Sequence, residues 1–359
     1  MQNIDSGSLH PSEQQRISEV LALIGFTSGW KGERGKGGMN NSTYMLHVDG
    51  TNYVMRQYET HNDPMKIAFE HEVLEALQRS NFKLDTPSPV RRLSGEGGTF
   101  LSVKDILTGH TKIVTLFHYR EGVNPIWHTP DQLIGLGEAA GSLSSVMATL
   151  DIPLEPVYPP YYRIQDAYPL CSPERLLQLC TSPPEQLAAC ANELKQLRDE
   201  LPDFFEALRG MEHLPHQLVH GDVNASNVLI DQQDGEICAI LDFEFATWDL
   251  RVMELAVPMS DLLTMDKSED WMWQAQEGLI RGFREQVSLE PEELLAIPRL
   301  ILLRSLDVVM HFISRMFEGT DEPEVAVEQI VKLKQRMDWM RLHEERLREI
   351  LVFNYRCYE

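Results

Sequence analysis

The stretch Leu218-Val-His-Gly-Asp222-Val-Asn-Ala-Ser-Asn227-Val-Leu-Ile230 is followed, after a turn at Asp234-Gly235, by Ile237-Cys-Ala-Ile-Leu-Asp242-Phe-Glu244. Two short apolar strands flank the turn, and polar side chains stand at their outer ends. If the strands pair as a hairpin, the Asn227 amide and the Asp242 carboxylate emerge at one end, beside Asp222. Hard oxygen ligands gathered at one point are typical of a magnesium site.

This arrangement resembles the catalytic loop and metal aspartate of the protein-kinase-like superfamily, in which D-x-x-x-x-N precedes D-F. His-Gly-Asp at 220–222 replaces His-Arg-Asp, Asp-Phe-Glu at 242–244 replaces Asp-Phe-Gly, and no Ala-Pro-Glu follows. The variant resembles the aminoglycoside phosphotransferase and choline kinase family, including its homoserine-kinase-like members. The resemblance implies an α+β, bilobal protein-kinase-like fold. Residues 1–118 would form a small antiparallel-sheet, nucleotide-binding lobe, and residues 119–359 a larger, mainly helical lobe for catalysis and substrate binding.

The same resemblance implies roles for three side chains of this stretch. Asp222 would orient the acceptor hydroxyl or act as its base, while Asn227 and Asp242 would bind Mg²⁺, with ATP as the phosphate donor. We interpret His220 as a brace for the loop. A plain surface hairpin could also carry Asp and Asn, which favour turns. The coincidence of both motifs with two apolar strands favours a catalytic site instead.

The first 118 residues predict a small antiparallel sheet with helices. Ser12 and Gln15 suggest a capping box for a helix that ends near Gly25, and Asp49-Gly50 predicts a hairpin turn. We expect a further helix over 64–80. The expected strands are Thr43–Val48, Asn52–Tyr58, a pair formed by Val90–Leu93 and Thr99–Val103, and Ile113–Phe117.

Several residues of this first part are candidate nucleotide contacts. The glycine-rich loop would bring backbone amides to the phosphates. The resemblance implies that Arg56 would supply the cation that many members of the superfamily take from lysine, and that the backbone near 117–119 would meet adenine. Glu70 is the expected partner of Arg56, with Glu72 as runner-up. The predicted contacts are Gly35, Gly37, Gly38, Asn41, Arg56, Glu70, Phe117 and Tyr119.

Composition and charge exclude other classes of protein. The 32 Lys and Arg residues against 55 Asp and Glu residues give a net charge of -23, which disfavours a nucleic-acid partner because such binding is driven by basic side chains. Five cysteines without a C-x-x-C spacing predict neither a zinc site nor a disulfide framework. With no signal-peptide pattern and no long apolar run, we expect a cytoplasmic protein without membrane contact. Its oligomeric state is left open.

The acceptor is the open question at this level. A small amine-bearing metabolite of the homoserine or choline sort is preferred, an aminoglycoside or macrolide antibiotic is the alternative, and an ATP-binding pseudokinase scaffold is an alternative of another class. The retained trio of Asp222, Asn227 and Asp242 argues against the scaffold. The sequence does not select acceptor contacts among Tyr161, Tyr162, Arg163, Asp261, Arg304, Asp307, His311 and Arg315.

Overall fold

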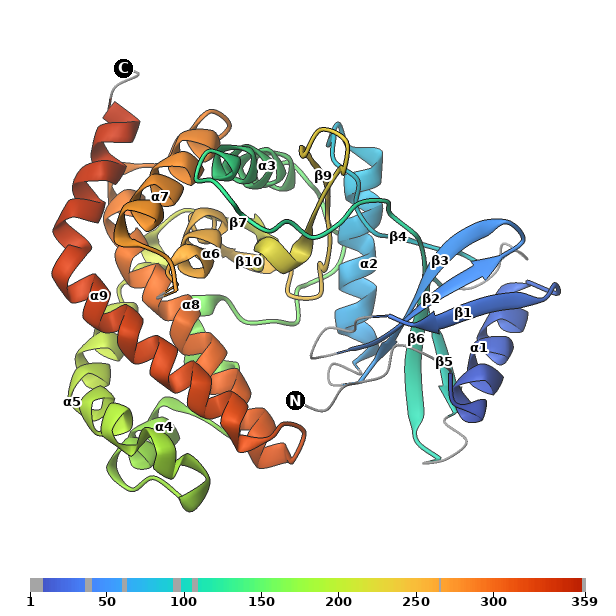
Figure 1. Ribbon diagram of the computed structural model, residues 1–359, viewed down its shortest axis with the longest axis horizontal. Coiled ribbons are helices and arrows are strands. Elements are labelled where there is room, and N and C mark those ends of the chain that lie inside the picture. Colours follow the sequence, from blue (N-terminus) through green and yellow to red (C-terminus); the bar gives the residue numbers. More distant parts are fainter. Residues whose placement is uncertain are drawn as a thin grey trace. The chain divides into compact units, whose positions relative to one another are not determined.

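The computed structural model describes residues 9–35, 41–59, 63–92, 98–104, 109–264 and 266–356. The chain divides into two compact units (Figure 1). Unit 1 comprises Met1–Val123, Asp151–Val157 and Cys238–Glu244. Unit 2 comprises Asn124–Leu150, Tyr158–Ile237 and Phe245–Glu359.

Unit 1 is built on an antiparallel sheet. Its strands are β1 (Trp30–Arg34), β2 (Asn41–Val48), β3 (Thr51–Tyr58), β4 (Ser88–Pro89), β5 (Leu101–Lys104) and β6 (Thr111–His118). The order is β1-β2-β3-β6-β4, and β5 also pairs with β6. Asp49 and Gly50 both have positive φ, 51° and 79°, as a two-residue hairpin turn of type I′ requires. The predicted hairpin at Asp49-Gly50 is therefore confirmed.

The predicted pairing of Val90–Leu93 with Thr99–Val103 is wrong. Ser88 and Pro89 lie opposite His118 and Phe117, while Leu101–Lys104 lies opposite Thr111–Val114. Both segments thus bond to the longer strand β6 instead of to each other. Alternating apolar residues identify a strand but do not identify its partner, and this explains the error.

Helix α1 (Pro11–Ile24) begins one residue before Ser12, its predicted cap. His10 is the N-cap, its ring accepts from the Ser12 amide, and Glu13 accepts from the His10 amide at 2.8 Å. The capping box at Ser12 is therefore wrong, because Pro11 favours the first helical position and leaves His10 extended before it. The helix ends at Gly25, which adopts the left-handed conformation with φ 116°.

Helices α1 and α2 (Pro64–Arg79) contact side chains on opposite faces of the sheet. Along β3, Tyr53 and Met55 join the apolar core under α1, and Tyr58 joins a second cluster with Ile67 of α2. Because side chains alternate between faces of a strand, Arg56 lies on the α2 face. The strand period thus brings Arg56 next to Glu70 of α2.

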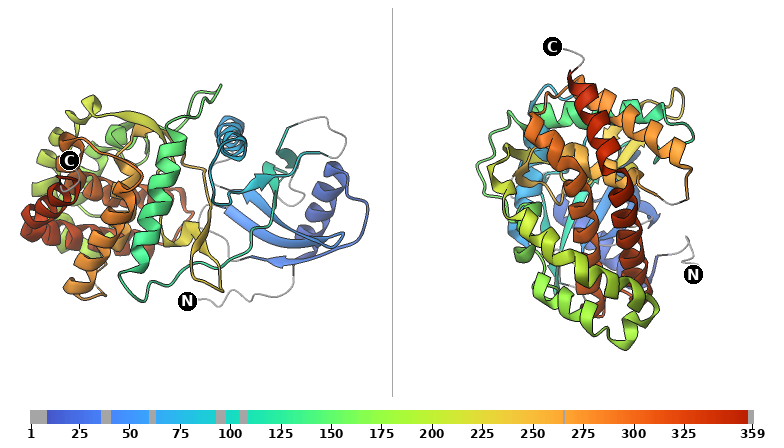
Figure 2. Two further views of the ribbon diagram at one scale, coloured as in Figure 1. Left: turned by 90° about the horizontal axis from the view of Figure 1, so that it is seen from above. Right: turned by 90° about the vertical axis from the view of Figure 1, so that its left-hand side faces the viewer.

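Unit 2 is mainly helical. Its helices are α3 (Gln132–Met147), α4 (Pro173–Thr181), α5 (Ala191–Leu208), α6 (Met253–Leu262), α7 (Glu269–Arg284), α8 (Pro291–Glu318) and α9 (Pro323–Arg356), with short 3-10 helices η1 (Tyr161–Asp166), η2 (Glu185–Cys190), η3 (Met211–His213) and η4 (Ala225–Asn227). Strand β7 (His216–Val219) pairs antiparallel with β10 (Thr247–Leu250), which was not predicted. Figure 2 shows α8 and α9 running side by side.

Strands β8 (Val228–Ile230) and β9 (Ile237–Ile240) form where the sequence predicts them. From Cys238 onward, β9 belongs to unit 1. Asp85 of unit 1 binds this strand through its backbone. The Asp85 amide donates to the Cys238 carbonyl, and the Asp85 carbonyl accepts from the Ile240 amide, both at 2.9 Å. The segment that leads to Asp242 is thereby fixed in unit 1.

Glycines allow α3 and α7 to pack unusually closely. A Cβ at Gly282 would lie 2.0 Å from the Ile134 carbonyl oxygen, and one at Gly137 would lie 2.1 Å from the Leu279 carbonyl oxygen. The two backbones therefore touch where any larger residue would separate them.

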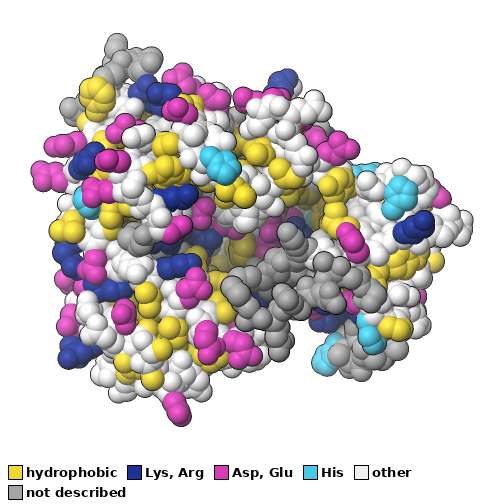
Figure 3. All heavy atoms as spheres, in the orientation of Figure 1, with side chains coloured by type: hydrophobic (Ala, Val, Ile, Leu, Met, Phe, Trp, Pro, Cys, Tyr) yellow, Lys and Arg dark blue, Asp and Glu magenta, His cyan; other side chains and the backbone are white. Residues whose placement is uncertain are grey.

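On the face of the helical unit seen in Figure 3, basic side chains lie interspersed with acidic ones. None of the described helices combines the length and apolarity needed to cross a membrane.

Candidate active site

The loop between β7 and β8 carries Asp222, and Glu254 holds the backbone of this loop by hydrogen bonds. Glu254, at the start of α6, is fully buried. Its Oε1 accepts from the backbone amides of His220 and Gly221, the latter at 3.0 Å. Gly221 has φ 76°, and a Cβ there would meet no atom closer than 3.5 Å. Backbone conformation rather than space therefore requires glycine before Asp222.

The Asp222 carboxylate is held on both oxygens by side chains of unit 2. Asn227 Nδ2 donates to Oδ2 at 2.9 Å and to the Asp222 carbonyl at 2.9 Å. Asn224 Nδ2 donates to Oδ1 at 3.1 Å, and Arg304 Nη2 donates to the same oxygen at 2.6 Å. The amide oxygen of Asn227 points away from Asp222 and accepts from Ser226 Oγ at 3.4 Å.

Arg304 belongs to a partly buried polar cluster formed by α8, η1 and the segment that follows η1. Its Nη1 donates to Asp307 at 3.1 Å, and the Tyr168 hydroxyl donates to Asp307 at 2.8 Å. The guanidinium carbon lies 5.9 Å from the centre of the Tyr161 ring, and the Tyr161 hydroxyl donates to the Gly221 carbonyl at 2.8 Å. The cluster thus adjoins the Asp222 loop at several points.

Two carboxyl groups behind this loop have raised pKa values. Burial raises the pKa of Glu254 to about 7, against the lowering effect of its two backbone hydrogen bonds. Burial likewise raises the pKa of Asp249 to about 7. Asp249 accepts from the amides of Tyr161 and Leu250, both at 2.6 Å. These hydrogen bonds give both groups bracing roles, since each carboxylate is aimed at backbone.

In unit 1, Arg56 joins Glu70 and Asp242. Arg56 Nη1 lies 3.2 Å from Glu70 Oε1 and 3.0 Å from Asp242 Oδ1, so the predicted pairing of Arg56 with Glu70, rather than Glu72, is present. The Tyr58 hydroxyl donates to Glu70 Oε2 at 2.9 Å. Burial raises the pKa of Glu70 to about 7, with Arg56 opposing the rise. Phe117 packs its ring 5.6 Å from the guanidinium carbon.

Asp242 occupies a strained backbone position. Its φ is 65°, which is uncommon for a residue with a side chain and is found at functional sites when the surrounding structure enforces it. Two residues on, Glu244 Oε2 accepts from Asn41 Nδ2 at 2.9 Å. A hydrogen bond therefore joins Asn41, which follows the glycine-rich loop, to Glu244 of the Asp-Phe-Glu motif.

The remaining predicted nucleotide contacts are placed as follows. The Gly35 amide donates to the Thr43 carbonyl at 2.9 Å, which ties the end of β1 to β2. Gly37 and Gly38 lie outside the described residues. The Tyr119 amide donates to the Asn52 carbonyl at 3.2 Å, so this amide is already engaged. An adenine contact in this segment would therefore use another backbone group.

The structure separates the acceptor candidates into two sets. Tyr161, Arg304 and Asp307 adjoin Asp222 as described, and His311 stacks edge-on against Tyr168 at 6.0 Å. The others point elsewhere: Tyr162 bonds His216, Arg163 pairs with Asp166, Arg315 pairs with Asp321, and Asp261 is exposed.

Three residues at or near the candidate site were not predicted from the sequence: Asn224, Tyr168 and Arg336. Asn224 lies inside the D-x-x-x-x-N motif, so its position offered a signal. Tyr168 and Arg336 carry no motif and are recruited only by the packing of η1, α8 and α9. Arg336 donates to the Ser305 hydroxyl at 3.1 Å, one residue from Arg304.

The described part of the chain contains no group of three or more His, Cys, Asp or Glu side chains positioned to hold a metal by themselves.

Known proteins resemble this chain in sequence. A model of the phosphotransferase enzyme family (APH) matches residues 31–286. Homoserine kinase of Zymomonas mobilis is 22% identical over 310 residues, 86% of this chain and 84% of that protein. Homoserine kinase of Paramagnetospirillum magneticum is 25% identical over 316 residues, 85% of each.

Solved structures share the fold. The microcompartment-associated aminopropanol kinase superposes with a TM-score of 0.64 at 16% identity, over 93% of this chain and 98% of that one. The amicoumacin kinase hAmiN, in complex with AMP-PNP and Ca²⁺, superposes with a TM-score of 0.63 at 15% identity, over 90% and 93%. The predicted protein-kinase-like fold, with a sheet-based N-terminal part and a helical C-terminal part, is confirmed.

Proposed function

This chain belongs to the phosphotransferase enzyme family, and from that premise we propose that it moves the γ-phosphate of ATP to a hydroxyl of a small, amine-bearing molecule. It is a small-molecule kinase by family. The choice of acceptor is supported by the homoserine kinases among its relatives and by the aminopropanol kinase that shares its fold. The single observation that carries the proposal is the Asp222 carboxylate, fixed on both oxygens at the end of a braced loop.

Asp222 would act on the acceptor hydroxyl. The hydroxyl oxygen attacks the γ-phosphorus, a new O–P bond forms, and the bond to the oxygen that bridges the β and γ phosphorus atoms breaks. ADP leaves with that electron pair, and the hydroxyl proton passes to the Asp222 carboxylate. The hydrogen bonds from Asn227 and Asn224 hold the carboxylate in one orientation, which favours in-line attack.

Asn227 and Asp242 would hold Mg²⁺ through their side-chain oxygens. Both groups are hard oxygen donors of the kind that Mg²⁺ prefers, and the Asp242 side chain remains 28% exposed beside Arg56. When bound, the ion would neutralise the charge that develops on the phosphates. Asn227 belongs to unit 2 and Asp242 to unit 1.

Residues of unit 1 would hold the remainder of ATP. Arg56 would contact the α and β phosphates while Glu70 fixes its guanidinium, and Gly35 and Asn41 would flank the phosphates with Gly37 and Gly38. The backbone near Phe117 and Tyr119 would meet adenine. In this proposal residues 1–118 bind nucleotide, and residues 119–359 supply catalysis and acceptor binding.

An aminoglycoside or macrolide acceptor is the alternative, since the spectinomycin phosphotransferase also shares the fold with a TM-score of 0.58 at 14% identity. A panel of hydroxyl compounds assayed for ADP formation with Mg·ATP tests the proposal. Turnover with a small amine-bearing alcohol and none with the antibiotics is expected. ADP formation only with antibiotics would replace the acceptor class, and no turnover with any compound would favour an ATP-binding scaffold.

A further inference from the structure

One arginine of α8 binds two carboxylates with its two terminal nitrogens. Arg304 Nη2 donates to Asp222 Oδ1 at 2.6 Å, and Nη1 donates to Asp307 Oδ2 at 3.1 Å. Asp222 comes from the loop after β7, whereas Asp307 lies three residues after Arg304 on α8. The planar guanidinium therefore divides its donors between the proposed catalytic group and a neighbour on its own helix.

Asp307 is itself held on both oxygens. Its Oδ2 accepts from Arg304, and its Oδ1 accepts from the Tyr168 hydroxyl at 2.8 Å. Burial raises the pKa of Asp307, and Arg304 and the Tyr168 hydroxyl oppose this rise. Both partners favour the ionised carboxylate, which is the form that binds a guanidinium strongly. A continuous chain of hydrogen bonds thus runs from Tyr168 through Asp307 and its arginine to Asp222.

The burial of this chain decides what the loss of Asp307 would do. The Arg304 side chain is 20% exposed, and its two acidic partners are each 14% exposed, so water competes weakly for the charges. Without Asp307, Nη1 of the arginine would lose its acceptor while Nη2 still faced Asp222. A bidentate guanidinium–carboxylate pair is stronger than a hydrogen bond from a neutral amide. Nη1 would therefore turn to Asp222 Oδ2, in competition with Asn227 Nδ2, which donates to that oxygen at 2.9 Å.

We propose that Asp307 is a positioning residue for phosphate transfer, because it holds Nη1 of Arg304 and so prevents the arginine from binding both oxygens of Asp222. The inference rests on the proposed function and adds a residue to it. A bidentate pair would pull the Asp222 carboxylate out of the orientation that Asn227 holds. It would also place a cation on both oxygens that could receive the hydroxyl proton. Tyr168 contributes to the same positioning by holding Asp307.

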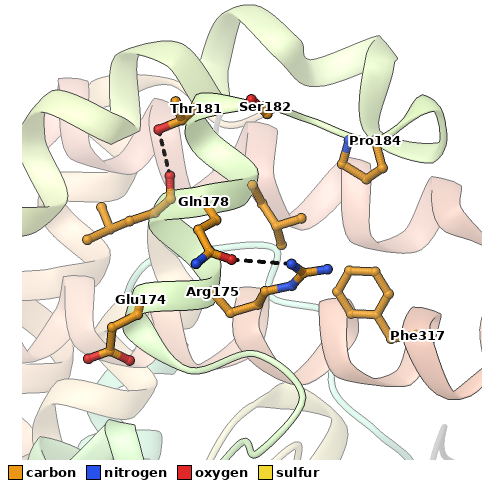
Figure 4. A pocket seen from close by; sticks show the side chains of 9 residues that line it. Glu174, Arg175, Gln178, Thr181, Ser182, Pro184 and Phe317 are labelled. Carbon is orange, nitrogen blue, oxygen red and sulfur yellow. Dashed lines mark hydrogen bonds between the residues drawn. The ribbon is translucent and has the colours of Figure 1, made fainter.

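Another arginine of unit 2 provides a matched control. Arg175 donates to Gln178, three residues on in α4, at 3.3 Å, and its guanidinium carbon lies 5.6 Å from the centre of the Phe317 ring. Arg304 likewise has its acceptor Asp307 three residues on and an aromatic ring at 5.9 Å. Figure 4 shows the Arg175 contact in a surface pocket of about 660 Å³ between α4 and the end of α8. Gln178→Ala therefore removes a comparable contact that involves none of the proposed catalytic or binding residues.

The test measures kcat and the KM for ATP with Mg·ATP and the alcohol of the panel that is turned over fastest, beginning with homoserine. Asp307→Asn should lower kcat by about 10- to 100-fold, since a misplacement of about 1 Å can cost on the order of 100-fold. The KM for ATP should stay unchanged, because Asp307 is not a proposed nucleotide contact. Tyr168→Phe removes only a hydroxyl and should lower kcat by about 2- to 10-fold. Gln178→Ala should leave both constants unchanged.

The same substitution in a second background separates positioning from a purely structural role. Arg304→Gln alone should lower kcat less than Asp307→Asn does, because Asn227 and Asn224 still bind the Asp222 carboxylate. Once the arginine is absent, Asp307 has nothing to restrain, so adding Asp307→Asn to Arg304→Gln should change kcat by less than about 2-fold. A purely structural Asp307 would cost the same factor in both backgrounds.

The outcomes separate this inference from the proposed function. An unchanged kcat in Asp307→Asn, or an equal loss with and without Arg304, would overturn the role of Asp307 while leaving a small-molecule kinase. Absence of ADP formation by the wild type with every alcohol would overturn the proposed function itself. If Asp307→Asn does not fold, as judged by its melting curve, Tyr168→Phe decides: its loss of kcat must disappear in the Arg304→Gln background.

Discussion

Arg56 Nη1 lies 3.0 Å from Asp242 Oδ1 and 3.2 Å from Glu70 Oε1, so one guanidinium ties strand β3 both to α2 and to the residue proposed to bind Mg²⁺. Burial is the largest single influence on the pKa of Arg56 and lowers it, but the neighbouring acidic groups, led by Asp242 and Glu70, together make the net shift upward. The cation is therefore permanently charged. Any change at Asp242 alters both the proposed metal ligand and the partner of Arg56.

Asp242→Ala should abolish phosphate transfer and weaken Mg·ATP binding, because it removes a proposed metal ligand and one of the two carboxylates that pair with Arg56. Titration calorimetry with Mg·ATP measures the affinity, and ADP release measures turnover. Asp266→Asn, at an exposed acid after α6, should leave both unchanged. Wild-type affinity for Mg·ATP in Asp242→Ala would refute the proposed metal role.

Asp222→Asn should lower kcat by about 10²- to 10⁴-fold, the usual contribution of a positioned proton acceptor. Nucleotide affinity should be unchanged, because Asp222 is not a proposed ATP ligand. Asn224→Ala removes only one of the donors to Oδ1 and should cost less. Measuring both Mg·ATP affinity and kcat separates the two roles, and full turnover by Asp222→Asn would exclude Asp222 as the base.

Glu254→Gln should flatten the dependence of stability on pH. The pKa of Glu254 is about 7 in the folded protein against an ordinary value of 4.5. Below about pH 4.5 the group is protonated in both states. As pH rises towards 7 the unfolded state releases its proton first, so stability falls, on the order of a few kcal/mol for this shift. Glutamine cannot titrate and retains an oxygen for the amides of His220 and Gly221.

Urea unfolding over this pH range checks the prediction for Glu254. The wild type should lose stability with rising pH more steeply than Glu254→Gln. Glu206→Gln, at an exposed glutamate paired with Arg209, should keep the wild-type slope. Equal slopes for wild type and Glu254→Gln would show that Glu254 does not titrate differently on folding.

Gly282→Ala should destabilise the protein by about 1–3 kcal/mol, because the added Cβ would force α7 away from the Ile134 carbonyl. The control is Gly135→Ala in α3, where a Cβ would meet nothing within 4 Å. That substitution should stabilise by about 0.5–1 kcal/mol, as alanine does in a helix interior. Melting temperatures report both, and destabilisation of equal size at the two sites would contradict the packing argument.

The individual helices, strands and turns could largely be predicted from the sequence, because short-range backbone preferences govern them. The Asp49-Gly50 turn, the α1 terminus at Gly25 and the helix after Pro64 follow from backbone conformations that few residues adopt. Which strands pair with one another was harder to predict. The pairing of β4 and β5 with β6, and the existence of β10, depend on which strand lies alongside, and residue type does not encode that.

By itself, the sequence determined the protein class and the proposed catalytic trio, because D-x-x-x-x-N and D-F-E fix the order of a few polar groups along a loop and a strand. Only the tertiary structure decided that Glu70 is the partner of Arg56, that Glu254 braces the loop, and that Arg304 from α8 reaches Asp222 across 82 residues of chain. The physical reason is that hydrogen-bond and ion-pair partners are selected by which surfaces pack together. Local spacing leaves that selection open.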